Sequence, residues 1–277
     1  MTWWAIDIRA APGERDALAS WLVGRTGQAV EERADGTLVS FALDASDAES
    51  LVQELRGRPG ALLGISRREV AEVDWAARWR AGLGPQSFGR LTVVPSWHPY
   101  EARAGEVVVV LDPGLAFGSG EHGSTRATLG LLERLLKPGD FVLDLGSGSG
   151  ILAIAAVRLG AARAIGIEQD GEAVAIAAGN AEQNGVGGRI EFFEGDAGQL
   201  APLFAPADLV TSNILRTVNL AILAEIRRTL RPDGMVILSG MEVVERGEFL
   251  AAMLEGGFRV VDEAVSGEWW AVAARPA

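Results

Sequence analysis

Hydrophobic and polar positions along the first 70 residues follow two periods in turn. Strand-like alternation is interrupted by apolar residues at helical spacing, as at Leu18, Trp21 and Leu22. The pattern predicts two helices and four strands: Trp3–Arg9, Pro12–Gly24 (helix), Gln28–Arg33, Thr37–Leu43, Ser46–Arg56 (helix) and Leu62–Val70. This β-α-β-β-α-β order is typical of a ferredoxin-like α+β domain, which we expect to span residues 1–71.

A different pattern begins near residue 90. Before it lie a short Trp/Arg-rich helix candidate, Asp74–Ala81, and a glycine-containing connector, Gly82–Gly89, so we expect a linker over residues 72–89. Two strands, Leu91–Ser96 and Val107–Asp112, come next. Helices and strands then alternate to the end of the chain. The expected helices are Ser124–Leu136, Leu152–Leu159, Gly171–Asn184, Val218–Leu230 and Glu245–Gly256. The expected strands are Phe141–Leu145, Arg163–Glu168, Arg189–Glu194, Ala207–Ser212, Met235–Ser239, Phe258–Ala264 and Trp269–Ala274. The alternation predicts an α/β, Rossmann-like open parallel sheet over residues 90–277.

The amino-acid composition excludes several kinds of catalytic and metal site. The 277 residues include no cysteine and two histidines, His98 and His122, which excludes disulfides, thiolate nucleophiles and multi-histidine metal centres. The net charge of −12 disfavours direct binding to nucleic acid and favours a cationic partner. No apolar stretch approaches the ~20 residues of a membrane span, and the N-terminus does not resemble a signal peptide. We therefore expect a cytoplasmic protein without a metal, and a monomer.

The main chemical signal is a glycine-rich turn. The apolar strand Phe141–Leu145 leads into Gly146, Gly148 and Gly150, and a helix follows. Ligands of open α/β sheets bind at the carboxyl ends of the strands, and glycine lets the backbone approach them closely. The spacing is G-x-G-x-G rather than the G-x-G-x-x-G of dinucleotide-binding proteins, which favours S-adenosylmethionine over a nicotinamide cofactor. A tight turn with incidental glycines is the simpler alternative.

Polar side chains follow the next strands. Glu168 is placed to accept hydrogen bonds from both hydroxyls of a ribose, or it is a solvated carboxylate. Asp196 either reaches an adenine amino group or caps a helix. Asn213 ends the strand beside the first one, where its carbonyl oxygen can accept an N–H from an amine and orient the lone pair. A turn asparagine is the alternative there.

A glycine-rich segment with one aromatic residue, Leu111–Thr125, precedes the first helix of this region. Such a segment can cover a ligand in front of the sheet, with Thr125 forming a hydrogen bond. His122 is a candidate general base, although a structural role is the alternative for a loop histidine.

These segments together resemble the PrmA family, the methyltransferases of large-subunit ribosomal protein eleven. Leu111–Thr125 is similar to the family's L-D-P-G-x-A-F-G-T-G-x-H-x-T-T, Asp144–Ala156 to D-x-G-x-G-S-G-I-L-A-I-A-A, and Asn213–Leu215 to N-I-L. The chain departs at Ser119 and Ser124, which replace threonines, and at Glu168, where the family commonly has aspartate.

The resemblance implies a class I S-adenosylmethionine-dependent methyltransferase whose small first domain holds the substrate protein. It also implies methylation of lysine side chains and of an N-terminal α-amine. The cofactor-contacting positions that we expect are Thr125, Gly146, Gly148, Gly150, Glu168, Asp196 and Asn213. The expected catalytic set is Asn213 as the polar guide, Phe117 and Leu215 as an apolar wall that lowers the amine pKa, and His122.

Other functions stay open from the sequence alone. A methyltransferase of another protein or of a small-molecule amine has the same motifs, and so does a non-catalytic S-adenosylmethionine-binding protein of ribosome assembly. The acidic surface favours a free, basic ribosomal protein as the substrate over the phosphate-rich assembled ribosome.

Overall fold

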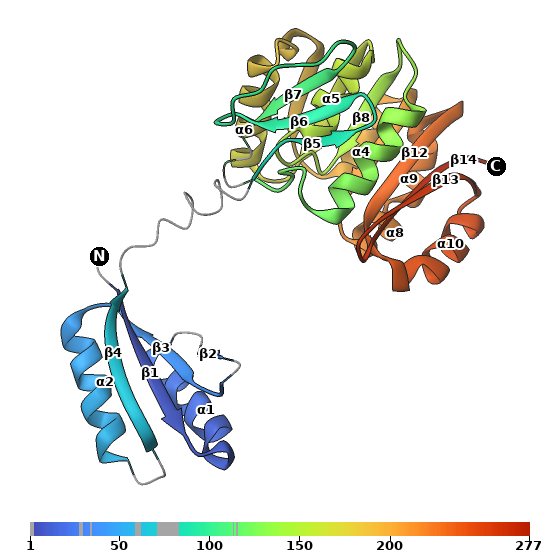
Figure 1. The fold of residues 1–277 in the computed structure, drawn as a ribbon. Coiled ribbons are helices and arrows are strands. Elements are labelled where there is room, and N and C mark those ends of the chain that lie inside the picture. Colours follow the sequence, from blue (N-terminus) through green and yellow to red (C-terminus); the bar gives the residue numbers. More distant parts are fainter. Residues whose placement is uncertain are drawn as a thin grey trace. The chain divides into compact units, whose positions relative to one another are not determined.

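The computed structural model describes residues 3–27, 30–33, 35–58, 62–70, 83–112, 114 and 116–277. The chain divides into two compact units, Met1–Gly82 and Leu83–Ala277 (Figure 1). Neither unit shares its hydrophobic core clusters with the other. The expected helix at 74–81 lies outside the described residues.

The first unit has the predicted ferredoxin-like order. Its antiparallel sheet has the strand order β2-β3-β1-β4. The elements are β1 (Trp3–Ala10), a 3-10 turn (Pro12–Glu14), α1 (Arg15–Thr26), β2 (Glu31–Glu32), β3 (Leu38–Ala42), α2 (Ala45–Gly57) and β4 (Leu62–Val70). Both helices pack on one face of the sheet, where alternate residues of β1, Ile6 and Ile8, meet Leu22 of α1 and Leu55 of α2. The second strand is shorter than the predicted Gln28–Arg33, whose first two residues are not among those described.

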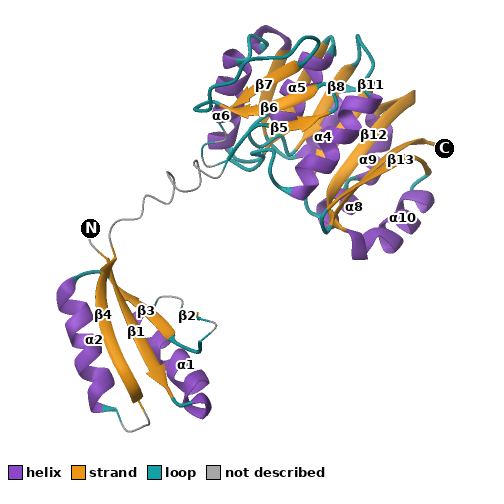
Figure 2. Ribbon diagram, in the orientation of Figure 1, coloured by secondary structure: helices purple, strands orange, loops and turns teal. Residues whose placement is uncertain are grey.

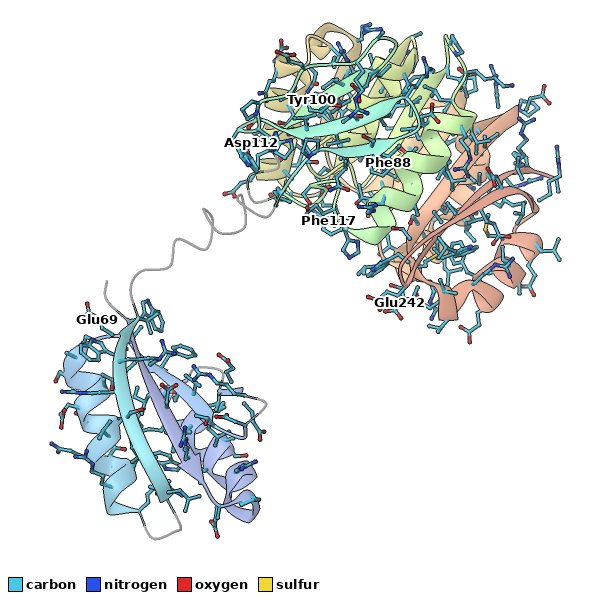
Figure 3. All side chains as sticks on the ribbon, in the orientation of Figure 1. Glu69, Phe88, Tyr100, Asp112, Phe117 and Glu242 are labelled. Atoms are coloured by element: carbon cyan, nitrogen blue, oxygen red, sulfur yellow. The ribbon has the colours of Figure 1, made fainter. Side chains whose placement is uncertain are left out.

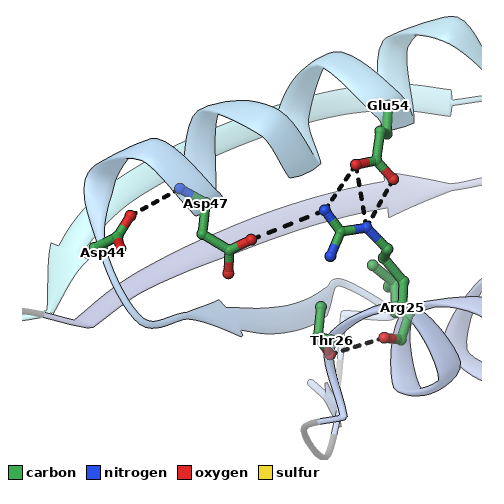
Figure 4. A network of polar contacts seen from close by, with 6 residues as sticks. Arg25, Thr26, Asp44, Asp47 and Glu54 are labelled. Carbon is green, nitrogen blue, oxygen red and sulfur yellow. Dashed lines mark hydrogen bonds and ion pairs between the residues drawn. The ribbon is translucent and has the colours of Figure 1, made fainter.

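An ion pair joins the two helices of this unit (Figure 4). Arg25 of α1 donates to both carboxylate oxygens of Glu54 on α2, with its Nη2 2.7 Å from Oε1 and its Nε 2.8 Å from Oε2. Asp44 caps the start of α2 by accepting the Asp47 N–H at 2.8 Å. This bidentate pair, whose geometry suits a planar guanidinium, links the two helices at the surface of the unit.

The second unit is built on a seven-stranded sheet with the order β10-β9-β8-β11-β12-β14-β13. Figure 2 draws the strands in orange and the helices in purple. The first five of these strands are parallel, and β14 runs antiparallel to both of its neighbours. The strands are β8 (Phe141–Leu145), β9 (Arg163–Glu168), β10 (Ile190–Glu194), β11 (Ala207–Asn213), β12 (Leu230–Glu242), β13 (Phe258–Ser266) and β14 (Trp269–Pro276). Chain order reverses between β8 and β11, and this switch point is where open α/β sheets bind their ligands.

Helices cover both faces of this sheet, and each face has its own apolar core. The helices are α4 (Gly123–Leu135), α5 (Ile151–Leu159), α6 (Gly171–Gln183), α7 (Ala197–Leu200), α8 (Arg216–Ala221), α9 (Leu223–Thr229) and α10 (Arg246–Glu255). Leu129 of α4 and Ile154 of α5 belong to one core, and Ile226 of α9 and Phe249 of α10 belong to the other. The layered α/β fold predicted from the sequence is therefore confirmed.

A three-stranded sheet, β5-β6-β7, packs its apolar side chains into the α4–α5 core. Its strands are β5 (Gln86–Phe88), β6 (Leu91–Pro95) and β7 (Val107–Leu111). The linker predicted over 72–89 is wrong at its C-terminal end, because β5 pairs with β6 and Leu83 is already buried. The second unit thus begins at Leu83 rather than at residue 90.

Two further predictions differ from the structure. The single helix expected at Val218–Leu230 is two helices, α8 and α9, which are separated at Ile222, whose backbone is not helical. Strand β12 begins at Leu230, which pairs with Ala207, and the register then shifts before Met235 pairs with Leu209. Leu230 therefore belongs to the sheet and not to the helix.

Candidate functional site

The glycine-rich turn leaves the carboxyl end of β8 and enters α5. Gly146, Gly148 and Gly150 have φ values of 71°, 51° and 80°, in the left-handed region that disfavours a side chain. A Cβ on Gly148 would lie 2.5 Å from the Phe117 carbonyl oxygen, and one on Gly146 would collide with Ile214. The glycines therefore let this turn pack closely between two other segments of the site.

Asp144, the fourth residue of β8, lies under this turn and is fully buried. Thr211 Oγ1 is 2.7 Å from Asp144 Oδ1, and the Ala153 N–H donates to Oδ2 at 3.3 Å. Burial raises the pKa of Asp144 to about 7, although these two hydrogen bonds lower it and the Glu168 charge raises it slightly. Nothing in the sequence marks Asp144 as unusual, because a carboxylate inside a predicted strand gives no signal of its burial.

Glu168 ends β9, next to the turn, as predicted. Its Oε2 accepts the Gly148 N–H at 2.9 Å, and its Oε1 accepts the N–H groups of Gln169 and Asp170 at 2.8 Å and 3.2 Å. These bonds fix the carboxylate against the glycine-rich turn. They occupy three of its roughly four acceptor positions. Among the described residues, one acceptor position on Oε2 is left without a donor. The contact of Glu168 with ribose hydroxyls stays a prediction.

Asp196 caps α7, which is the structural alternative that the sequence left open. Its Oδ1 accepts the Gln199 N–H at 2.9 Å, and its Oδ2 accepts from the Gln169 side chain at 3.1 Å. The Gln169 contact keeps Asp196 beside the end of β9, near Glu168. A contact from Asp196 to an adenine is untested.

Thr125 and Asn213 meet although 88 residues separate them in the chain. Asn213 Nδ2 donates to Thr125 Oγ1 at 3.1 Å, and Thr125 is fully buried in the first turn of α4. Asn213 Oδ1 is buried and has no hydrogen-bond partner. An unpaired buried amide oxygen is unfavourable by itself, so this atom is ready to accept an N–H from a ligand.

An apolar cleft of about 370 Å³ opens beside Asn213. Its lining consists of Phe117, His122, Ser124, Asn213, Ile214, Leu215, Gly240 and Trp269. All four predicted catalytic residues are in this set. Phe117 and Leu215 are highly exposed, at 57% and 71%, and Figure 3 shows Phe117 at the surface of the second unit. Sequence reasoning missed Trp269 and Gly240 here, since only the β12–β14 pairing brings them to the cleft.

His122 is held between two aromatic rings. Its ring centroid is 5.3 Å from that of Phe117 and 4.2 Å from that of Trp269. Its Nδ1 is 2.8 Å from Ser124 Oγ. Proton transfer by His122 would therefore run through Nε2, because Nδ1 is already engaged.

Ser149 connects the glycine-rich turn to the segment that carries Phe117. Its N–H donates to the Phe117 carbonyl at 2.9 Å, and its Oγ donates to the Gly118 carbonyl at 2.7 Å. Asn180 of α6 donates to the carbonyls of Ser149 and Asp112 at 2.9 Å and 3.0 Å. The segment that carries Phe117 is thus hydrogen-bonded to the glycine-rich turn, and its role as a cover over a ligand stays a prediction. Pro113 and Leu115 of this segment lie outside the described residues.

Known proteins match the chain over most of its length. The model of the family "Ribosomal protein L11 methyltransferase (PrmA)" matches residues 15–276. The chain belongs to this family. The ribosomal protein L11 methyltransferase of Pelotomaculum thermopropionicum is 40% identical over 245 residues, which cover 88% of this chain and 79% of that protein. The enzyme of the same name from Thermus thermophilus is 40% identical over 201 residues, covering 73% and 77%.

A solved structure agrees with this assignment. The ribosomal protein L11 methylase of Lactobacillus delbrueckii subsp. bulgaricus is 31% identical, with a TM-score of 0.64, and the match covers 70% of this chain and 99% of that one. The predictions of a methyltransferase and of S-adenosylmethionine as its cofactor are thereby confirmed. In the described parts of the chain, no helix is long and apolar enough to cross a membrane.

Proposed function

We propose that this enzyme transfers methyl groups from S-adenosylmethionine to amines of ribosomal protein L11, on lysine side chains and on the N-terminal α-amine. Relatives named for this substrate match both units of the chain, which supports the proposal. The observation that carries it is the unpaired, buried Asn213 Oδ1 beside an apolar cleft at the switch point of the sheet.

The residues present fit the cofactor. The turn from Gly146 to Gly150 leaves no room for side chains on its glycines, and the Glu168 carboxylate beside it keeps one acceptor position for a ribose hydroxyl. Asp196, on the far side of Gln169, is the candidate for the adenine end. When bound, S-adenosylmethionine supplies a methyl group on a positively charged sulfur. An amine lone pair can bond to the methyl carbon while the sulfur leaves as a neutral thioether.

The cleft residues prepare the acceptor amine. A free lysine has a pKa near ~10.4, so almost all of it is protonated at neutral pH. Burial against Phe117, Leu215 and Trp269 disfavours the charged form and lowers this pKa. Asn213 Oδ1 then accepts one N–H of the neutral amine and directs its lone pair, while Thr125 Oγ1 keeps the amide oriented by accepting from Nδ2. The proton released after transfer passes to water or to His122 Nε2.

The first unit is the candidate holder of the substrate protein, over residues 1–71, as the sequence suggested. We place the reaction on the free ribosomal protein in the cytoplasm, since the net charge of −12 favours a basic protein and repels ribosomal RNA. We also propose that the enzyme acts as a monomer.

Mass spectrometry of purified L11 incubated with the enzyme and S-adenosylmethionine tests this function. We expect mass increments of one methyl group or more on L11, and a loss of roughly 10- to 100-fold in rate for Asn213→Ala, because proximity and alignment of the amine contribute much of the catalysis. Leu203→Ala is the matched control, since Leu203 is exposed and away from the cleft. Unmodified L11, or equal rates for Asn213→Ala and the control, would refute the assignment.

A further inference from the structure

Exposed carboxylates are next to cleft-lining residues in the chain. Glu121 and Glu268 immediately precede His122 and Trp269, whose ring centroids lie 4.2 Å apart with the ring planes at 56°, and both glutamates are exposed. Glu242 is the register partner of Trp269 in the β12–β14 pair. Paired residues of antiparallel strands project from the same face of a sheet, so Glu242 lies beside the Trp269 side chain.

Two more glutamates form ion pairs with an arginine that is next to a cleft residue in the chain. Arg216, next to Leu215 of the cleft, pairs with Glu245 at 2.9 Å and with Glu248 at 3.0 Å. We call the five glutamates 121, 242, 245, 248 and 268 the acidic rim. Within the described residues, the three that flank the cleft, Glu121, Glu242 and Glu268, have no ion-pair partner, so the rim keeps a strong negative charge.

Exposed apolar side chains lie between the rim carboxylates. Val244 is 84% exposed, and its neighbour Val243 is 40% exposed and is tied to β14 by its N–H bond to the Glu268 carbonyl. Phe117 and Leu215, which line the cleft, are exposed apolar side chains as well. Figure 3 shows Glu242 on the second unit, as it does Phe117. An apolar path into an amine site, with unpaired carboxylates beside it, complements a chain that is cationic on both sides of its acceptor.

We propose that the acidic rim is a docking surface of the catalytic unit for an extended segment of the substrate protein in which arginines or lysines flank the acceptor amine. This inference rests on the proposed amine methylation. It adds that the catalytic unit selects an acceptor amine by the positive charge of the residues beside it, without the first unit. Exposed charges on such a rim raise the encounter rate and weaken with salt, because they act through solvent.

Binding of labelled peptides to the full-length protein tests the rim without any methyl transfer. One peptide has a central lysine with two arginines on each side, and the other has serines in place of the arginines. We expect the wild-type protein to bind the arginine peptide at least tenfold more tightly, with a difference that shrinks as salt is added. Equal affinity for the two peptides overturns the proposal, whatever the variants do.

Charge-neutralising variants locate the binding. Glu121→Gln, Glu242→Gln and Glu268→Gln together should weaken binding of the arginine peptide by roughly tenfold, about 1.4 kcal/mol. Glutamine at 242 keeps the acceptor oxygen for the cap on the Glu245 N–H. The control carries Glu191→Gln, Asp233→Asn and Glu255→Gln, three exposed acids elsewhere on the same unit, and has the same net charge. Equal weakening in both variants would assign the effect to net charge and refute the rim. Methylation of L11, measured separately, tests the proposed function and not the rim.

Discussion

The burial of Asp144 beneath the glycine-rich turn makes the free energy of unfolding depend on pH. Its pKa is about 7 in the folded protein, against an ordinary value of 3.8, and burial is the main cause. The folded protein therefore binds this proton more tightly than the unfolded chain does. The contribution of Asp144 to the free energy of unfolding therefore falls as pH rises from about 4 to about 7, and levels off above that. Three pKa units correspond to roughly 4 kcal/mol in total.

The substitution Asp144→Asn should abolish this dependence. A neutral Asp144 can donate from Oδ1 to Thr211 Oγ1, which in turn can donate to the Leu143 carbonyl, while Oδ2 accepts the Ala153 N–H. An amide reproduces both contacts, with its NH₂ in the place of Oδ1. The variant thus mimics the protonated acid at every pH.

Urea unfolding of both proteins from pH 5 to pH 8 measures the effect. We expect the stability of Asp144→Asn relative to wild type to increase by about 3 kcal/mol over this interval, since two of the three pKa units lie within it. Contributions from groups that titrate alike in both proteins cancel in the difference. An NMR titration of the Asp144 carboxyl carbon gives the pKa directly. A constant difference between the two proteins, or one that grows toward acid pH, would refute the argument from burial.

Four further predictions concern the same site. Glu168→Ala should lower S-adenosylmethionine affinity by roughly 10- to 100-fold in calorimetry, and Glu168→Gln by less, because one acceptor oxygen remains. Gly146→Ala should lower stability and cofactor affinity together, since φ is 71° there and the new Cβ meets Ile214; unchanged thermal melting would contradict this. Ser149→Ala removes the 2.7 Å bond to Gly118 and should raise the KM for L11, with a stability loss near ~1 kcal/mol. A fragment that starts at Leu83 should bind the cofactor like the full chain but lose methylation of L11; full L11 activity in that fragment would remove the first unit from substrate binding.

Local patterns were enough to predict the elements whose ends are marked by sequence. Strands Phe141–Leu145 and Arg163–Glu168 begin and end as predicted, because each is an apolar run bounded by charge, glycine or a turn. The helix predicted at Ser46–Arg56 matches α2 to within one residue at each end, whereas α1 begins at Arg15 and continues to Thr26, beyond the predicted end at Gly24. These signals are carried by neighbouring residues in the chain.

The features that could not be predicted depend on contacts between residues that are far apart in the sequence. The three residues of β5 have no strand pattern and become a strand only by pairing with β6. Trp269 joins the cleft because β14 pairs with β12, and Asp144 becomes unusual only because Thr211 and α5 enclose it. Single-sequence periodicity contains none of this information.

The contacts of Ser149 and Gly148 change how the glycine motif is understood. In the sequence, the glycines explain close approach of a ligand to the turn. In the structure, Gly148 also makes room for the Phe117 carbonyl, and Ser149 binds the carbonyls of Phe117 and Gly118. The glycine-rich turn and the segment that carries Phe117 are therefore joined by hydrogen bonds. A displacement of either one requires a displacement of the other or the loss of these bonds.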